Sequence, residues 1–198
     1  MHLDQGNTAF ILISAALVLL MTPGLAFFYG GMVKAKSVVS MMMLSFGSLG
    51  LIGVLWVLYG YAIAFSTIHK GGSAIGIPHV FVFDPTYVGL DAQLKDALNP
   101  TGAYPSMAFV AFQATFAIIT VALISGAIAD RAKFGAWMVF AGVWATLIYF
   151  PVANWVFNFT LDSHGKVVDG GWIVAKLGVI DFAGGTAVHI NAGAAGLA

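Results

Sequence analysis

Long stretches without a charged residue dominate the pattern of hydrophobic and polar positions along this chain. The stretch Thr8–Phe28 has 21 residues, and as a helix rising 1.5 Å per residue it measures about 31 Å, enough to cross a hydrocarbon core of about 30 Å. Three further stretches are as long and as apolar: Ser37–Phe65, Met107–Ala129 and Gly135–Phe157. We predict a transmembrane helix for each of the four.

A fifth apolar segment follows a polar one. After Leu161 the chain is polar up to Asp181, and from there it runs without charge to Ala198. We expect a fifth helix from Asp181. The predicted fold class is an all-α, polytopic membrane helix bundle, with residues 1–198 forming part of one transmembrane domain. The start of the first span lacks the basic residues of a signal peptide, and Pro23 within it predicts a kink.

The composition agrees with a membrane protein. Hydrophobic residues make up 60% of the 198 residues and charged residues 8%, against about 25% charged in a soluble domain. The eight basic and eight acidic residues give no net charge, so the chain lacks the excess of positive charge that a nucleic-acid-binding protein needs. The absence of cysteine excludes a thiolate zinc site and a cysteine nucleophile. No nucleotide-binding pattern is present, and we expect neither an enzyme, nor a cofactor, nor a bound metal.

The connections between the spans predict the orientation in the membrane. The two short connections carry four basic residues next to helix ends, whereas the long connections mix four lysines with five aspartates. Because the positive-inside bias acts on charges close to helix ends, we place the short connections in the cytoplasm and the N-terminus outside. The four basic residues are Lys34, Lys36, Arg131 and Lys133.

This topology brings aromatic rings and a carboxylate to one external vestibule. Phe112 and Phe116 are four residues apart and share a helix face, in the outer half of the third span. Trp155 and Phe157 lie at the outer end of the fourth span, level with Asp181. The rings fit either a lipid-facing aromatic belt or a cation–π site. Asp181 fits a helix cap, and in that role its carboxylate still lies near the rings.

His189 is the clearest candidate from physical chemistry alone. It follows Asp181 by eight residues, which as helix corresponds to about 12 Å into the membrane. Ionisable groups at such depth usually face a pore or a bundle interior, although a histidine hydrogen-bonded for packing is the alternative. Thr186 lies on the same face and is a second candidate for the pore wall. Four glycines allow neighbouring helices to approach closely: Gly184, Gly185, Gly193 and Gly196.

Four segments of the chain resemble the ammonium transporter family, Amt/Mep, with the Rhesus proteins as distant relatives. The segments are PGLAFFYGG at Pro23–Gly31, AFQATFAIIT at Ala111–Thr120, GAIADRAKF at Gly126–Phe134 and DFAGGTAVHINAG at Asp181–Gly193. The resemblance implies eleven transmembrane helices in two inverted five-helix repeats, of which this chain resembles the first. It also implies a homotrimer in the cell membrane, nitrogen uptake as ammonium, and a cytoplasmic regulatory protein as a further partner.

The resemblance also suggests roles for single residues. Phe112 and Phe116 match the phenylalanines of the outer gate, and Asp181 matches the acidic residue of the ammonium recruitment site. His189 matches the first of two pore histidines, and Phe28 matches a phenylalanine toward the cytoplasmic side of the pore. The second pore histidine and the serine of the recruitment site belong to the second repeat.

One aromatic position departs from the family pattern. The vestibule tryptophan of many members aligns with Phe157 when Pro151 sets the register, and Trp155 is the other candidate for the same ring. Asn154 stands where a histidine is expected and has no predicted role.

The predicted function is transport of ammonium. The ion binds at the external aromatic vestibule and loses a proton, and NH₃ then passes His189 through a hydrophobic pore, which avoids the large cost of moving a bare cation through a dry medium. The alternative is an ammonium sensor of the same fold, coupled to a signalling partner, which binds the ion without conducting it.

Overall fold

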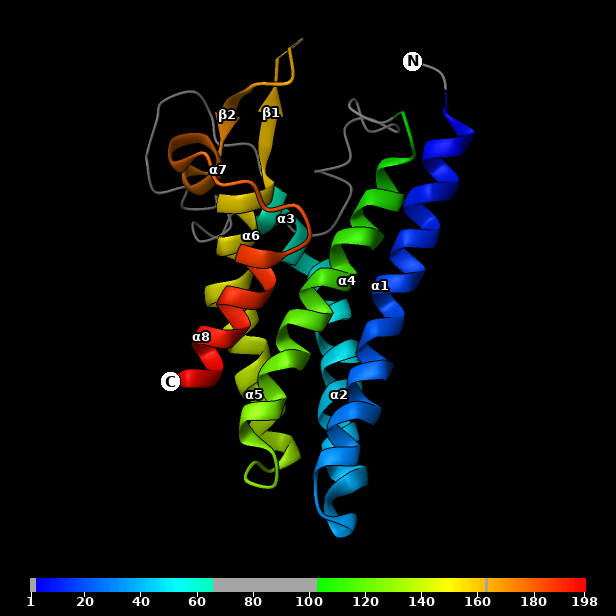
Figure 1. The fold of residues 1–198 in the computed structure, drawn as a ribbon, viewed down its shortest axis with the longest axis vertical. Helices are drawn as coiled ribbons and strands as arrows, with labels where there is room; N and C mark the ends of the chain where they lie inside the picture. Colours follow the sequence, from blue (N-terminus) through cyan, green and yellow to red (C-terminus); the bar gives the residue numbers. More distant parts are fainter. Residues whose placement is uncertain (1–2, 66–102, 163) are drawn as a thin grey trace.

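The computed structural model describes residues 3–65, 103–162 and 164–198. Four helical spans in the described residues run side by side (Figure 1), and each is long and apolar enough to cross a membrane. In chain order they are α1 (Gln5–Met32); η1 (Ala35–Ser37), α2 (Val38–Leu55), η2 (Trp56–Gly60) and α3 (Tyr61–Phe65); α4 (Ser106–Ile124) and η5 (Ser125–Ile128); and α5 (Phe134–Trp144), η6 (Ala145–Tyr149) and α6 (Phe150–Phe157). The chain is therefore a multi-pass membrane helix bundle.

The two ends of the bundle differ. The short connections between α1 and α2 and between α4 and α5 lie at one end, and the N-terminus lies at the other (Figure 1). The N-terminal end also carries a two-stranded antiparallel hairpin, β1 (Phe159–Leu161) and β2 (Val167–Gly170), and the short helix α7 (Trp172–Leu177). The hairpin turn is held by Asp162, whose Oδ1 accepts hydrogen bonds from the backbone N–H groups of His164 (2.8 Å) and Lys166 (2.9 Å).

The last helix starts later than the sequence suggested. It begins with a π-helical turn, η7 (Gly185–Ile190), and continues as α8 (Asn191–Leu197), so the expected start at Asp181 is wrong by four residues. Gly184 precedes it with φ +81°, a left-handed conformation that suits glycine. A Cβ at Gly184 would come within 2.8 Å of the Val188 side chain. The backbone geometry of Gly184 therefore sets the first turn.

Buried polar side chains join the helices through backbone carbonyls. The Trp56 indole N–H donates to the Val110 carbonyl (3.1 Å), and the Trp137 indole N–H donates to the Leu44 carbonyl (2.9 Å). The Tyr29 hydroxyl donates in the same way to the Leu123 carbonyl (3.0 Å). Such bonds between helices hold a membrane bundle together, because no water is present in the bilayer core to satisfy these groups instead.

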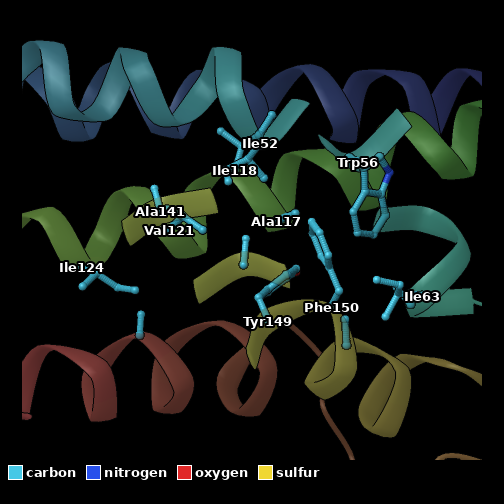
Figure 2. Close-up of a cluster of buried hydrophobic side chains, with 14 of the residues drawn as sticks. Ile52, Trp56, Ile63, Ala117, Ile118, Val121, Ile124, Ala141, Tyr149 and Phe150 are labelled. Carbon is cyan, nitrogen blue, oxygen red and sulfur yellow. The ribbon is translucent and has the colours of Figure 1, made fainter. Parts of the chain in front are cut away.

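The apolar core lies where the second, third and fourth spans meet (Figure 2). Trp56 and Phe150 are fully buried there, with ring centroids 5.7 Å apart. Trp56 is the first residue of the π-helical turn η2, and Phe150 directly follows the π-helical turn η6. A 2.9 Å hydrogen bond between the Tyr59 and Thr146 hydroxyls joins the two turns. π-Helical turns occur often at functional sites, and here η2 leads directly into α3 and η6 directly into α6.

Candidate functional site

A cavity of about 700 Å³ opens beside the hairpin at the N-terminal end of the bundle. Four parts of the chain line it: α3, the residues from Tyr104 along α4, the end of α6 with β1, and the segment before η7. Of the fifteen lining residues in the described part of the chain nine are aromatic, and Asp181 is the one acid among them. The cavity thus unites rings and a carboxylate from distant parts of the sequence.

Phe112 and Phe116 both line this cavity. Their ring centroids are 4.9 Å apart with an interplanar angle of 89°, an edge-to-face pair. The spacing of four residues places both rings on one face of α4, as the sequence indicated. Edge-to-face rings are electrostatically favourable neighbours, and each ring keeps a negative face that attracts cations.

The structure separates the two aromatic candidates at the end of α6. Phe157 lines the cavity, whereas Trp155 packs against Trp172 of α7 with ring centroids 5.8 Å apart. Residues two apart on a helix point to nearly opposite sides, so both rings cannot face one cavity. Gly171 fixes this packing, because a Cβ there would approach the Trp155 backbone to 2.3 Å.

Asp181 both caps the last helix and borders the cavity. Its Oδ2 accepts hydrogen bonds from the backbone N–H groups of Thr186 (3.0 Å) and Ala187 (2.9 Å), so it caps the first turn from four residues before the helix, whereas the sequence suggested that Asp181 itself is the N-cap residue. Its Oδ1 is buried and makes no hydrogen bond within the described residues. One carboxylate oxygen is therefore hydrogen-bonded to the backbone, and the other has no hydrogen-bond partner among the described residues.

The other three candidates lie away from the cavity. His189 is exposed on η7, and its backbone N–H donates to the Gly184 carbonyl (2.9 Å), so it lies about one turn from the start of the helix. The depth of about 12 Å expected for His189 assumed that the helix begins at Asp181. Residues 181–184 are not helical, so that depth is not supported. Thr186 is half-buried, and its backbone N–H is bonded to Asp181. Phe28 is 62% exposed and lies near the C-terminal end of α1.

Sequence reasoning assigned only four of the cavity's described lining residues to the site, and five of those it missed lie on or just before the helices α3 and α4. They share apolar or neutral polar character and lie in or next to predicted spans, with no local signal to distinguish them: Tyr61, Phe65, Tyr104, Phe109 and Gln113. Burial raises the pKa of Tyr104 above its ordinary value, so this phenol is neutral at pH 7.

Asn154, which had no role in the sequence analysis, has a clear one here. Its side-chain amide donates to the Ala64 carbonyl at 3.0 Å, and the residue is 1% exposed. This bond ties α6 to the C-terminal end of α3, which carries two of the missed cavity residues. Asn154 therefore helps to hold the cavity walls together.

Comparisons with known proteins match nearly the whole chain. The sequence pattern of the Ammonium Transporter Family matches residues 9–198. An ammonium transporter of Mycobacterium tuberculosis is 56% identical over 202 residues, and one of Bacillus subtilis is 45% identical over 195 residues. Each alignment includes 98% of this chain but only 41% and 43% of the two relatives, so the chain spans about two fifths of their length.

Solved structures give the same match. The crystal structure of Candida albicans Mep2 resembles this chain with a TM-score of 0.73 and 30% identity, over 99% of this chain and 38% of that one. Saccharomyces cerevisiae Mep2 resembles it with a TM-score of 0.70 and 29% identity, over 100% of this chain and 40% of that one.

The divided role of Asp181 predicts different effects for two substitutions. Asp181→Ala removes both cap hydrogen bonds and should lower the stability of the complete protein by about 0.5–2 kcal/mol. Asp181→Asn keeps an oxygen acceptor and should cost much less, while removing the negative charge. Thermal unfolding in detergent measures both, and equal losses for the two variants would contradict the cap geometry.

Proposed function

This chain belongs to the ammonium transporter family, and from that membership we propose that the longer protein it is part of carries ammonium across the cell membrane. The observation that supports this most directly is the cavity in which Phe112, Phe116, Phe157 and Asp181 meet. Aromatic faces and a carboxylate, with no basic side chain among the described lining residues, form an environment that favours a small cation.

In the proposed mechanism the cavity recruits NH₄⁺. Each ring that presents its face to the ion stabilises it by about 0.5–2 kcal/mol, and more when water is excluded. The Asp181 carboxylate adds a long-range attraction, although Oδ2 is held by the two cap hydrogen bonds. The Phe112 and Phe116 rings then narrow the way inward, so that the ion must shed water to proceed.

Deprotonation solves the energetic problem of crossing the membrane. Moving a bare cation into an apolar medium costs tens of kcal/mol in the ideal limit, whereas neutral NH₃ avoids almost all of that cost. We therefore place loss of the proton at the cavity, before the apolar pore, where NH₄⁺ gives its proton to external water and leaves NH₃ and H₃O⁺. His189 then offers a ring nitrogen as a hydrogen-bond acceptor to the passing NH₃.

Completion of the pore requires more protein than this chain. His189 and Ile190 are exposed on η7, and Leu197 on α8 is 90% exposed. We propose that further parts of the longer protein cover this face and form the opposite pore wall, with Thr186 and Phe28 among the pore-lining residues. A homotrimer and a cytoplasmic regulatory partner belong to the same proposal and follow from the family resemblance alone.

The proposed path predicts a specific effect of Phe116→Ala. In proteoliposomes carrying the full-length protein, the KM for methylammonium uptake should rise about two- to thirtyfold, the equivalent of one lost cation–π contact. Phe10→Ala on α1 is the matched control, because Phe10 is 72% exposed and is not among the described residues that line the cavity. Equal behaviour of the two variants would assign Phe116 to ordinary packing, and methylammonium binding without uptake would favour the sensor.

His189 should control selectivity. In the full-length protein, His189→Asp replaces the imidazole with a carboxylate, whose negative charge lowers the barrier for a bare cation. Selectivity for ammonium over potassium should therefore fall by about tenfold or more, as measured by ion-replacement currents. His164→Asp in the exposed hairpin turn is the control and should leave selectivity unchanged.

The proposed orientation is testable by labelling in intact cells. Ala35→Cys lies in the short connection next to Lys34 and Lys36, and His164→Cys lies in the hairpin turn at the opposite end of the bundle. An impermeant thiol reagent should modify position 164 and not position 35. The reverse pattern would place the cavity on the cytoplasmic side.

A further inference from the structure

The cavity is much larger than its proposed ion. NH₄⁺ is about the size of a water molecule, which takes up about 30 Å³, whereas the cavity measures about 700 Å³. Cavities of this size typically hold organic molecules. Ammonium at the Phe112 and Phe116 rings contacts only one part of the wall that this chain supplies, and the remaining aromatic lining residues are available to a larger cation.

A second aromatic wall lines this space, and two of its three rings come from another part of the chain. It consists of Tyr61 and Phe65 of α3 and Phe109 of α4, all of which line the cavity. The Tyr61 and Phe65 rings stack at 5.1 Å and 29°, and the Phe65 and Phe109 rings meet edge to face at 5.2 Å and 75°. Trp56 supports the wall from behind, with ring centroids 5.8 Å from Tyr61 and 6.3 Å from Phe65.

The charges around the cavity favour a cation with an apolar surface. Its described lining residues include no lysine, arginine or histidine, and Asp181 supplies a negative charge. The Gln113 amide, on a residue 7% exposed, adds a neutral polar group to the lining. Several rings arranged around a cation, with a carboxylate nearby, are the arrangement by which proteins recognise quaternary ammonium groups.

We infer that this cavity binds small quaternary ammonium ions, of the size of choline, between the second aromatic wall and the Phe112 and Phe116 rings. A quaternary nitrogen carries four carbon substituents and no N–H bond, so it has no proton to release and no neutral form that can enter the pore. Such an ion occupies the cavity and blocks the passage of ammonium. The binding is independent of transport, whereas the block rests on the proposed function.

The first test compares choline with 3,3-dimethyl-1-butanol, the neutral molecule of nearly the same shape in which carbon replaces nitrogen. Binding to the purified full-length protein in detergent is measured by titration calorimetry. Choline should bind at least about tenfold more tightly than the alcohol, because only the cation is attracted by the ring faces and by Asp181. In proteoliposomes, choline should inhibit methylammonium uptake competitively and the alcohol should not.

The second test uses variants of the wall. Phe65→Leu and Phe109→Leu should each weaken choline binding about two- to thirtyfold, and Phe10→Leu on α1 is the matched control. Thermal unfolding shows whether each variant is folded. The comparison of choline with its neutral analogue uses the unaltered protein and does not depend on any variant.

The outcomes separate this inference from the proposed function. Equal binding of choline and the alcohol, no choline binding by a protein that takes up methylammonium, or unchanged binding in both folded variants would each overturn the inference. Choline binding that depends on the wall, in a protein that moves no methylammonium, would support the inference and refute transport.

Discussion

The structure depends on one constraint of the bilayer: every polar group that enters it must find its partner within the protein. Helices satisfy their own backbone, and several buried side-chain donors bond to carbonyls of neighbouring helices. The Trp137 indole holds α5 against α2, the Trp56 indole holds η2 against α4, and the Asn154 amide holds α6 against the end of α3. These few directional bonds fix how helices of otherwise similar apolar surface are placed against each other.

The cavity is a direct consequence of those bonds. Asn154 and Trp56 position α3 so that Tyr61 and Phe65 face the same space as the rings of α4. On the other side, Gly184 and the Asp181 cap start the last helix at the edge of that space. A wide opening lined with rings therefore forms at the end of the bundle, although the surrounding core is closely packed.

Asp181 illustrates how a structural and an electrostatic role coexist in one side chain. A carboxylate that caps a helix is held in place by N–H donors, and its charge is partly offset by them. It still attracts a cation over several ångströms, and its position does not depend on the cation being bound. Its second oxygen, buried without a hydrogen bond in the described residues, keeps acceptor capacity.

The sequence by itself determined the four long spans, because bilayer thickness sets a length of uncharged helix that can be counted along the chain. It also determined the Phe112 and Phe116 pair, since two residues four apart share a face of a helix. Only the tertiary structure decided that Phe157, rather than Trp155, faces the cavity, and that Tyr61 and Phe65 form a second wall. The bond that places α3 joins residues 90 positions apart, and the preference of each ring for one side of its helix depends on such distant partners. In a span that is apolar on every face, no local pattern shows which face meets a neighbour, which meets lipid and which lines a cavity.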